Sequence, residues 1–157
     1  EIKPEMATLV PEKRQELTTE GGLDVISHKS SVKKTVDELH RSGIMVSLFI
    51  DPNPQQIEVS REEIGADCIE IHTGAFADAK DSDHAQRELE KIGEAVSVAS
   101  RLGMGINAGH GLNYYNIKQL LSFEQIAEYS IGHSIIGRAI MVGMEQAVRE
   151  MITLVKG

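Results

Sequence analysis

CIEIHTG (residues 68–74) and MGINAGHGL (residues 104–112) are the stretches that decide the fold. Each begins with a short apolar run and ends in histidine and glycine. Such apolar runs recur along the chain at residues 6–10, 44–50, 68–71, 104–106 and 130–132. Several of them are continuous rather than alternating, which is typical of strands that are covered on both faces of a parallel sheet.

Segments with apolar residues at helical spacing follow most of these runs, and the longest is expected at about residues 82–102. The helical stripes are Val32, Val36 and Leu39; Leu89, Ile92, Val96 and Ala99; and, near the C-terminus, Ile140, Met144, Val148 and Met151. Strand and helix therefore alternate five times along the chain. This alternation predicts an α/β fold with parallel strands and right-handed crossovers.

Helix boundaries carry matching signals. Asn53 is expected as an N-cap, with Pro54 at the first helical position and Gln56 completing a variant of the capping box. Glycine follows three helical segments where a left-handed residue is expected, at Gly43, Gly65 and Gly103. Gly93 departs from the pattern, because a glycine inside a helix costs about 1 kcal/mol relative to alanine.

Two architectures fit this alternation. One is an open doubly wound sheet, and the other is a TIM (β/α)8 barrel, which typically needs roughly 250 residues. With five βα units in 157 residues, the chain is expected to be a complete open sheet or an incomplete barrel. No linker or low-complexity tract divides the sequence, so residues 1–157 are expected to form a single domain.

Composition excludes several classes of protein. The chain is 41% hydrophobic and 25% charged, as globular proteins are, and its formal charge of −8 argues against a bulk nucleic-acid binder. No apolar run approaches the roughly 18 residues of a membrane helix. The single cysteine, Cys68, excludes a disulfide scaffold and is interpreted as a packing residue. No His-x-x-x-His or Cys-x-x-Cys motif occurs, so no metal is predicted, although Glu70 and His72 could both be ligands in principle. No nucleotide-binding glycine motif occurs either.

Histidines gather where strands are expected to end. His72, His110 and His133 each lie at or just after the carboxyl end of an apolar run. The other three, His28, His40 and His84, fall in loop or helix segments and are expected at the surface. The carboxyl ends of parallel strands meet at one edge of the sheet, and a histidine cluster there suits proton transfer or anion binding.

Turns of small residues follow the last two apolar runs, at residues 108–112 and 132–134. In barrels, backbone N–H groups and a helix N-terminus at this position often hold a phosphate, whereas the alternative is ordinary turn glycine. The polar stretch TTEGG, residues 18–22, is either a surface loop or an active-site lid.

Glu70 and His72 lie two residues apart on one expected strand. Their side chains should therefore face the same side, while Ile69 and Ile71 face the helices. In a barrel, the side of the strand that carries Glu70 would face the pocket. We expect Glu70 to be ionised there and to have a partner, either His72 or a residue outside this chain.

Several motifs together resemble the pyridoxine 5′-phosphate synthase family. They run in the same order along the whole chain: LVPEKRQE (9–16) with TTEGGLD (18–24), VSLFID (46–51), IEIHTG (69–74), NAGHGLN (107–113) with Asn116, and IGHSIIGRA (131–139). The resemblance implies a TIM barrel of which this sequence matches the last five βα units. The family's first third, with a further catalytic histidine and glutamate, has no counterpart here. We therefore expect a chain that is truncated at its N-terminus.

The resemblance also implies an activity. The family consists of cytoplasmic, homo-oligomeric (octameric) transferases that bind small phosphorylated substrates and use no cofactor. They condense 3-amino-2-oxopropyl phosphate with 1-deoxy-D-xylulose 5-phosphate to give pyridoxine 5′-phosphate, phosphate and water. By this resemblance His110 is the proton donor, Glu70 stabilises the transition state, and substrate or product contacts Thr18, Gly111, Gly132 and His133.

Two alternatives stay open. One is another phosphate-binding barrel enzyme of the epimerase or aldolase type. Such enzymes usually place a lysine or paired acids at strand ends, and no lysine ends the last four expected strands. The other alternative is an inactive fragment that acts only as a binding module.

Overall fold

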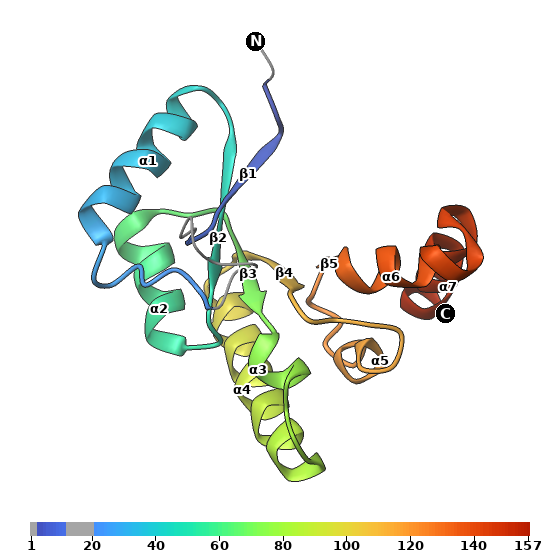
Figure 1. Cartoon of the computed structure of the whole chain (residues 1–157). Helices are drawn as coiled ribbons and strands as arrows, with labels where there is room; N and C mark the ends of the chain where they lie inside the picture. The colour runs from blue at the N-terminus through green and yellow to red at the C-terminus, as the bar shows by residue number, and fades with distance from the viewer. Residues whose placement is uncertain (1–2, 12–20) are drawn as a thin grey trace.

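A computed structural model of the chain describes residues 3–11 and 21–157. Within these residues, five strands form one parallel sheet in the order β1-β2-β3-β4-β5 (Figure 1). The strands are β1 (Met6–Leu9), β2 (Met45–Ile50), β3 (Cys68–His72), β4 (Gly105–Gly109) and β5 (Glu128–Ser130). Each strand pairs only with its neighbours in sequence, whereas the order of a doubly wound sheet reverses at a switch point. The fold is therefore a curled half-barrel, as predicted for five βα units of a TIM barrel.

Helices connect the strands, and Figure 1 shows α1, α2 and α4 along one side of the sheet. The connections hold α1 (Lys29–Arg41), then α2 (Pro54–Val59) with the π-helical turn η1 (Ser60–Ile64), then α3 (Gly74–Ala77) and α4 (Ser82–Arg101). After β4 and β5 come α5 (Ile117–Leu120), α6 (His133–Val142) and α7 (Met144–Lys156). The expected alternation of strand and helix is confirmed.

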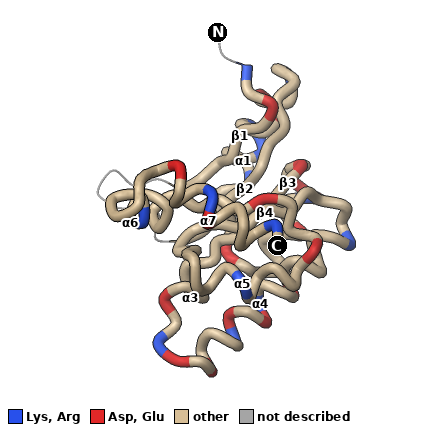
Figure 2. The backbone as a smooth tube through the Cα atoms, turned by 90° about the vertical axis from the view of Figure 1, so that its right-hand side faces the viewer, with Lys and Arg blue, Asp and Glu red and all other residues tan. Residues whose placement is uncertain are grey.

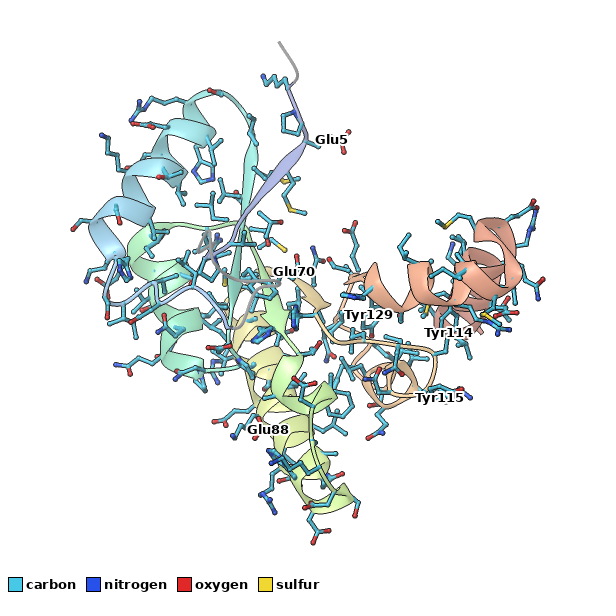
Figure 3. The ribbon with its side chains drawn as sticks, viewed as in Figure 1. Glu5, Glu70, Glu88, Tyr114, Tyr115 and Tyr129 are labelled. Atoms are coloured by element: carbon cyan, nitrogen blue, oxygen red, sulfur yellow. The ribbon has the colours of Figure 1, made fainter. Side chains whose placement is uncertain are left out.

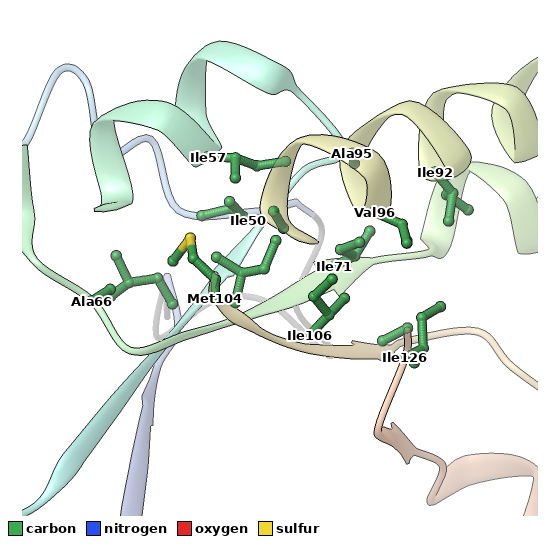
Figure 4. Close-up of a cluster of buried hydrophobic side chains, with 14 of the residues drawn as sticks. Ile50, Ile57, Ala66, Ile71, Ile92, Ala95, Val96, Met104, Ile106 and Ile126 are labelled. Carbon is green, nitrogen blue, oxygen red and sulfur yellow. The ribbon is translucent and has the colours of Figure 1, made fainter. Parts of the chain in front are cut away.

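Alternate residues of the central strands build the core against α2 and α4 (Figure 4). Ile50, Ile71 and Ile106 come from three adjacent strands and are almost completely buried. Ile57 of α2 and Ile92 of α4 belong to the same cluster. Burying one such side chain stabilises a fold by roughly 1.5–3 kcal/mol. Because these residues face the helices, the residues between them on each strand face the concave side.

Two of the predicted helical stripes are confirmed. Val32 and Val36 of α1 are buried, and α4 buries Ile92, Val96 and Ala99. Gly93 of α4 also finds an explanation, because a Cβ atom there would lie 3.1 Å from Cε1 of Phe123. The glycine makes room for an aromatic ring that packs against the helix.

Asn53 caps α2 as predicted, because its side-chain oxygen accepts the backbone N–H groups of Gln55 and Gln56. The other half of the predicted capping box is wrong. The Gln56 amide oxygen accepts the N–H of Val25, and its nitrogen donates to Asp24, so this side chain links α2 to the loop before α1. Gly43, Gly65 and Gly103 have positive φ, as expected for residues that follow a helix.

The single C-terminal stripe predicted from Ile140 to Met151 is wrong. Gly143 adopts a φ of 85°, which ends α6 and starts α7 in a new direction. Ile140 is consequently 81% exposed, whereas Met151 is buried. Apolar spacing alone does not show this change of direction.

Strand β5 lies two residues earlier than predicted, at Glu128–Ser130 rather than 130–132. Its pairing with β4 ends where Gly109 meets Ser130, because β4 ends there. Ile131 is apolar because it packs against the core, and not because it belongs to the strand.

Acidic and basic residues are interspersed along the described backbone (Figure 2). Arg138 of α6 pairs with Glu150 of α7 at 2.9 Å, and exposed pairs of this kind typically contribute less than about 1 kcal/mol. Over residues 3–11 and 21–157, no helix is both long enough and apolar enough to cross a membrane.

Candidate active site

Polar side chains lie at the carboxyl ends of β3 and β4, on the sheet face opposite to the core. The strand register places Glu70 beside Phe49 of β2 and Asn107 of β4. Ile69 and Ile71, on either side of Glu70 in the chain, are completely buried in the core. Figure 3 shows Glu70 on the side of the sheet away from α1 and α2. The alternation of the strand thus turns Glu70 toward the concave side.

A cavity of about 430 Å³ opens on this side, at the carboxyl ends of β3, β4 and β5. It brings together five residues that were expected in the site: Glu70, His110, Gly111, Gly132 and His133. The other described residues that line it are Val10, Phe49, Leu112, Ser130 and Ile131. Thr18 lies outside the described residues, and His72 does not line this cavity.

His110 has a backbone conformation that is unusual for its residue type. Its φ is 81°, and among the described residues it is the only one other than glycine with a positive φ. A residue with a Cβ atom is strained in this region, so surrounding contacts must hold it there. Strained residues of this kind cluster at functional sites.

The surroundings of His110 also change its acidity. Burial lowers the pKa of its imidazole, and the positive charges that His72 and His133 can carry lower it further. Asp78 acts in the opposite direction. The imidazolium form of His110 is therefore a stronger acid than an ordinary histidine.

Glu70 occupies space that a glycine leaves open. A Cβ atom at Gly109 would lie 2.5 Å from Oε1 of Glu70 and 2.8 Å from Cβ of Ser130. Burial raises the pKa of the Glu70 carboxyl, the Ser130 hydroxyl opposes this shift, and Glu128 adds to it. A negative charge here is costly on its own, and a positive charge in the cavity would relieve that cost.

Helix α6 begins at the cavity. Gly132 is its N-cap residue and His133 its first residue, and both line the cavity. No side chain in the described part of the chain caps this helix end, so the N–H groups of the first turn remain available to an anion. A Cβ atom at Gly132 would meet nothing within 4 Å, so the approach to these groups is open.

The hydrogen-bond partner of His72 is Asp51 rather than Glu70. The Nδ1–H of His72 donates to Oδ1 of Asp51 at 2.8 Å, and this bond lowers the pKa of the Asp51 carboxyl. His72 is the last residue of β3, and its ring reaches toward the end of the neighbouring strand, where Asp51 follows Ile50.

Sequence patterns place Asp51 and Thr73 just after two apolar runs, yet neither is among the residues predicted for the site. The signal for Asp51 was available, since it directly follows the apolar run 44–50 and so ends at the same sheet edge. Thr73 follows His72 at the end of the apolar run 68–71, but the sequence does not show what its hydroxyl contacts. Its hydroxyl reaches the carbonyl oxygen of His110 only because β3 and β4 are paired.

The remaining histidines and Cys68 do not line the cavity. His28 and His40 are exposed, and His84 is partly exposed beside Glu88. Cys68 is buried, and burial raises the pKa of its thiol, which disfavours the reactive thiolate. These positions agree with surface and packing roles. The cavity therefore brings together a histidine with a lowered pKa, a half-buried carboxyl group and a helix N-terminus.

Comparison with known proteins places the chain in a family. The family model described as pyridoxal phosphate biosynthesis protein PdxJ matches residues 1–157. The chain belongs to the PdxJ family. Its relatives include proteins named pyridoxine 5′-phosphate synthase from Geobacter metallireducens, 57% identical, and Geotalea uraniireducens, 59% identical, each over 155 residues. The protein of the same name from Syntrophobacter fumaroxidans is 52% identical over 156 residues.

These alignments cover 99% of the present PdxJ chain and 64% to 65% of the relatives. The chain thus spans about 64% of the length of curated relatives such as the Geobacter metallireducens protein.

Proposed function

We propose that this chain is part of a pyridoxine 5′-phosphate synthase. The reaction is the condensation of 3-amino-2-oxopropyl phosphate with 1-deoxy-D-xylulose 5-phosphate, which gives pyridoxine 5′-phosphate, phosphate and water. The names of the PdxJ relatives support this assignment. The observation that carries it is the cavity of about 430 Å³, because this space joins Glu70, His110 and the start of α6.

His110 is the proposed proton donor. It follows β4 directly, and the glycines on both sides of it leave space for a ligand to approach. Burial lowers the pKa of His110, so its protonated form gives up a proton more readily than an ordinary histidine does. A proton held by this imidazole is then released readily to a leaving hydroxyl or to a carbonyl oxygen.

Glu70 is the proposed stabiliser of the transition state. Condensing an amine with a carbonyl group develops positive charge, and the Glu70 carboxylate lines the same cavity as His110. Burial makes this carboxylate poorly solvated, which strengthens its attraction for a cation that forms nearby.

The phosphate of a substrate is proposed to bind at Gly111, Gly132 and His133. Gly132 and His133 bring the N-terminus of α6 to the cavity, and helix N-termini favour anions. Thr18, outside the described residues, is a further proposed contact on the family resemblance alone. The backbone N–H groups at the start of α6 explain how a chain with a formal charge of −8 could bind anionic substrates.

The assignment is tested on the full-length protein that carries this sequence. It is incubated with both substrates and without any added cofactor, and pyridoxine 5′-phosphate and phosphate are measured. We expect equal amounts of the two products, and no product from either substrate alone. An epimerase or aldolase would instead convert a single sugar phosphate, and a binding module would bind phosphate without turnover. Either result would overturn the synthase assignment.

The assembly and location of the enzyme are proposals too. We propose a cytoplasmic homo-oligomer in which residues 1–157 belong to a single domain, the C-terminal portion of the barrel. Support for self-association comes from the family resemblance alone. Light scattering on the purified full-length protein measures the assembly, and a monomer would contradict it.

A further inference from the structure

His110 lies against the segment His72–Gly74, which joins β3 to α3. The centroids of the His72 and His110 rings are 4.9 Å apart, and the ring planes are inclined by 58°. A Cβ atom at Gly74 would lie 2.6 Å from Nε2 of His72 and 3.1 Å from Cδ2 of His110. Gly74 therefore leaves room for both rings, and the packing restricts the His110 ring on this side.

The Thr73 side chain holds the backbone at His110. Its hydroxyl lies 2.6 Å from the carbonyl oxygen of His110 and 2.8 Å from that of Gly109. The backbone N–H of Thr73 also donates to the Gly109 carbonyl, at 2.9 Å. Thr73 is completely buried, so water does not compete for these bonds. The hydroxyl thus fixes the peptide group of His110, whose φ of 81° needs support.

Asp51 in turn fixes the His72 ring. The 2.8 Å bond from Nδ1 of His72 ends on Oδ1 of Asp51, which also accepts the backbone N–H of Gly22 at 3.0 Å. His72 is only 8% exposed, and its Nε2 has no hydrogen-bond partner among the described residues. A buried nitrogen without a partner is unfavourable, so packing alone does not explain a histidine at this position.

We infer that Thr73 and the Asp51–His72 pair are positioning residues, which hold His110 in its left-handed conformation with its ring at the cavity. This rests on the proposed role of His110 as proton donor. The described lining of the 430 Å³ cavity includes none of the three. Asp51 and His72 border, with His110, a second cavity of about 600 Å³. They act through His110, so their loss changes turnover rather than substrate affinity.

The first test compares Thr73→Val with Thr73→Ser in the full-length protein. Valine keeps the branched shape and removes the hydroxyl, whereas serine keeps the hydroxyl. We expect Thr73→Val to lower kcat by roughly 10- to 100-fold while KM for each substrate changes by less than about threefold. Thr73→Ser should keep kcat within about threefold of the parent. Equal losses in both variants, or a loss confined to KM, overturn the role of Thr73.

The second test removes the Asp51–His72 pair by Asp51→Asn and, separately, by His72→Gln. Each variant should lower kcat by roughly tenfold or more with little change in KM. The matched control is His40→Gln, which breaks another Asp–His contact, between Nε2 of His40 and Oδ2 of Asp67, also 2.8 Å long. A kcat that stays unchanged in Asp51→Asn and His72→Gln, or a rise in KM alone, overturns the inference for this pair.

The third test observes the His110 imidazole by NMR and does not depend on enzymatic activity. The NMR signals of the His110 imidazole are assigned by their absence in His110→Ala. They should shift or broaden in Thr73→Val, return in Thr73→Ser and stay in place in His40→Gln. If the parent protein lacks synthase activity, the proposed function fails while this test still applies. His110 signals that do not change in Thr73→Val overturn the positioning role whatever the activity.

Discussion

The Oγ atom of Ser134 donates a hydrogen bond of 2.9 Å to the carbonyl oxygen of Leu112. This bond joins the first turn of α6 to the glycine turn that follows β4. Asn116 stabilises this glycine turn, because its Nδ2 donates to the carbonyl oxygen of Gly111 at 3.1 Å. The two turns that border the cavity therefore have a fixed relation, which suits backbone N–H groups that bind an anion without rearrangement.

Replacing Gly132 by valine should weaken phosphate binding and leave the fold intact. A Cβ atom at Gly132 meets nothing within 4 Å, and its φ of −116° is negative, so a side chain there avoids left-handed strain. The added methyl groups would occupy the approach to the α6 N–H groups. We expect the Kd for inorganic phosphate and the KM for the substrates to rise at least roughly tenfold, or about 1.4 kcal/mol. Titration calorimetry and steady-state kinetics on the full-length protein measure both.

Gly137→Val is the matched control for this change. Gly137 lies further along the same helix, and a Cβ atom there also meets nothing within 4 Å. This variant should bind phosphate as the parent does. If Gly132→Val also binds phosphate normally, the N-terminus of α6 is not the anion site.

Sequence periodicity predicts which face of a strand a residue occupies, but not its partner. Glu70 lies on the face opposite to Ile69 and Ile71 because side chains alternate along β3. The partner of His72 is harder to predict from the sequence, since Asp51 follows another strand, β2, and lies 21 residues earlier in the chain. Only the pairing of β2 with β3 brings the two residues together.

Local backbone conformation is a second feature that sequence patterns do not predict. The glycines beside His110 suggest a turn, but they do not indicate that the histidine itself has a φ of 81°. That conformation depends on Thr73, which is 37 residues earlier. At the C-terminus, apolar residues at helical spacing suggest one helix, and the turn at Gly143 directs Ile140 to the surface instead.

Replacing His110 by alanine should remove the proposed proton donor. We expect turnover of the full-length protein to fall by roughly 10²- to 10⁴-fold, the usual contribution of one positioned acid or base. His84→Ala serves as the control, because His84 lies on α4 and is partly exposed, away from the cavity. Steady-state rates of pyridoxine 5′-phosphate formation measure the effect. Near-normal turnover of His110→Ala would assign proton donation to another group.

Glu70→Gln keeps the shape of the side chain and removes its charge. Turnover should fall by roughly 10²- to 10³-fold, as when one preorganised electrostatic group is lost. Full activity of the glutamine variant would return Glu70 to a structural role.

The same variant has a pH-dependent effect on stability. Burial raises the pKa of Glu70 above its usual value of 4.5 in the folded state. The folded protein therefore loses stability as pH rises from that value through the raised pKa, because the carboxylate becomes charged where it is poorly solvated. Glutamine has no such loss. The Tm of Glu70→Gln relative to the parent should thus be higher at pH 7 than at pH 4, and a difference that is the same at both pH values would contradict the burial effect.

His72→Gln should raise the pKa of His110. Burial, His72 and His133 lower that pKa below its usual value of 6.5, and Asp78 raises it. Removing His72 removes one of the lowering charges and leaves burial, His133 and Asp78 in place. If protonated His110 is the acid, kcat falls as pH rises through this pKa, and in His72→Gln the fall should move to higher pH although the maximum rate is lower. NMR titration of His110 and the pH profile of kcat should shift together, with His40→Gln as the unshifted control. A fall that stays in place or moves to lower pH would show that His72 does not set the acidity of His110.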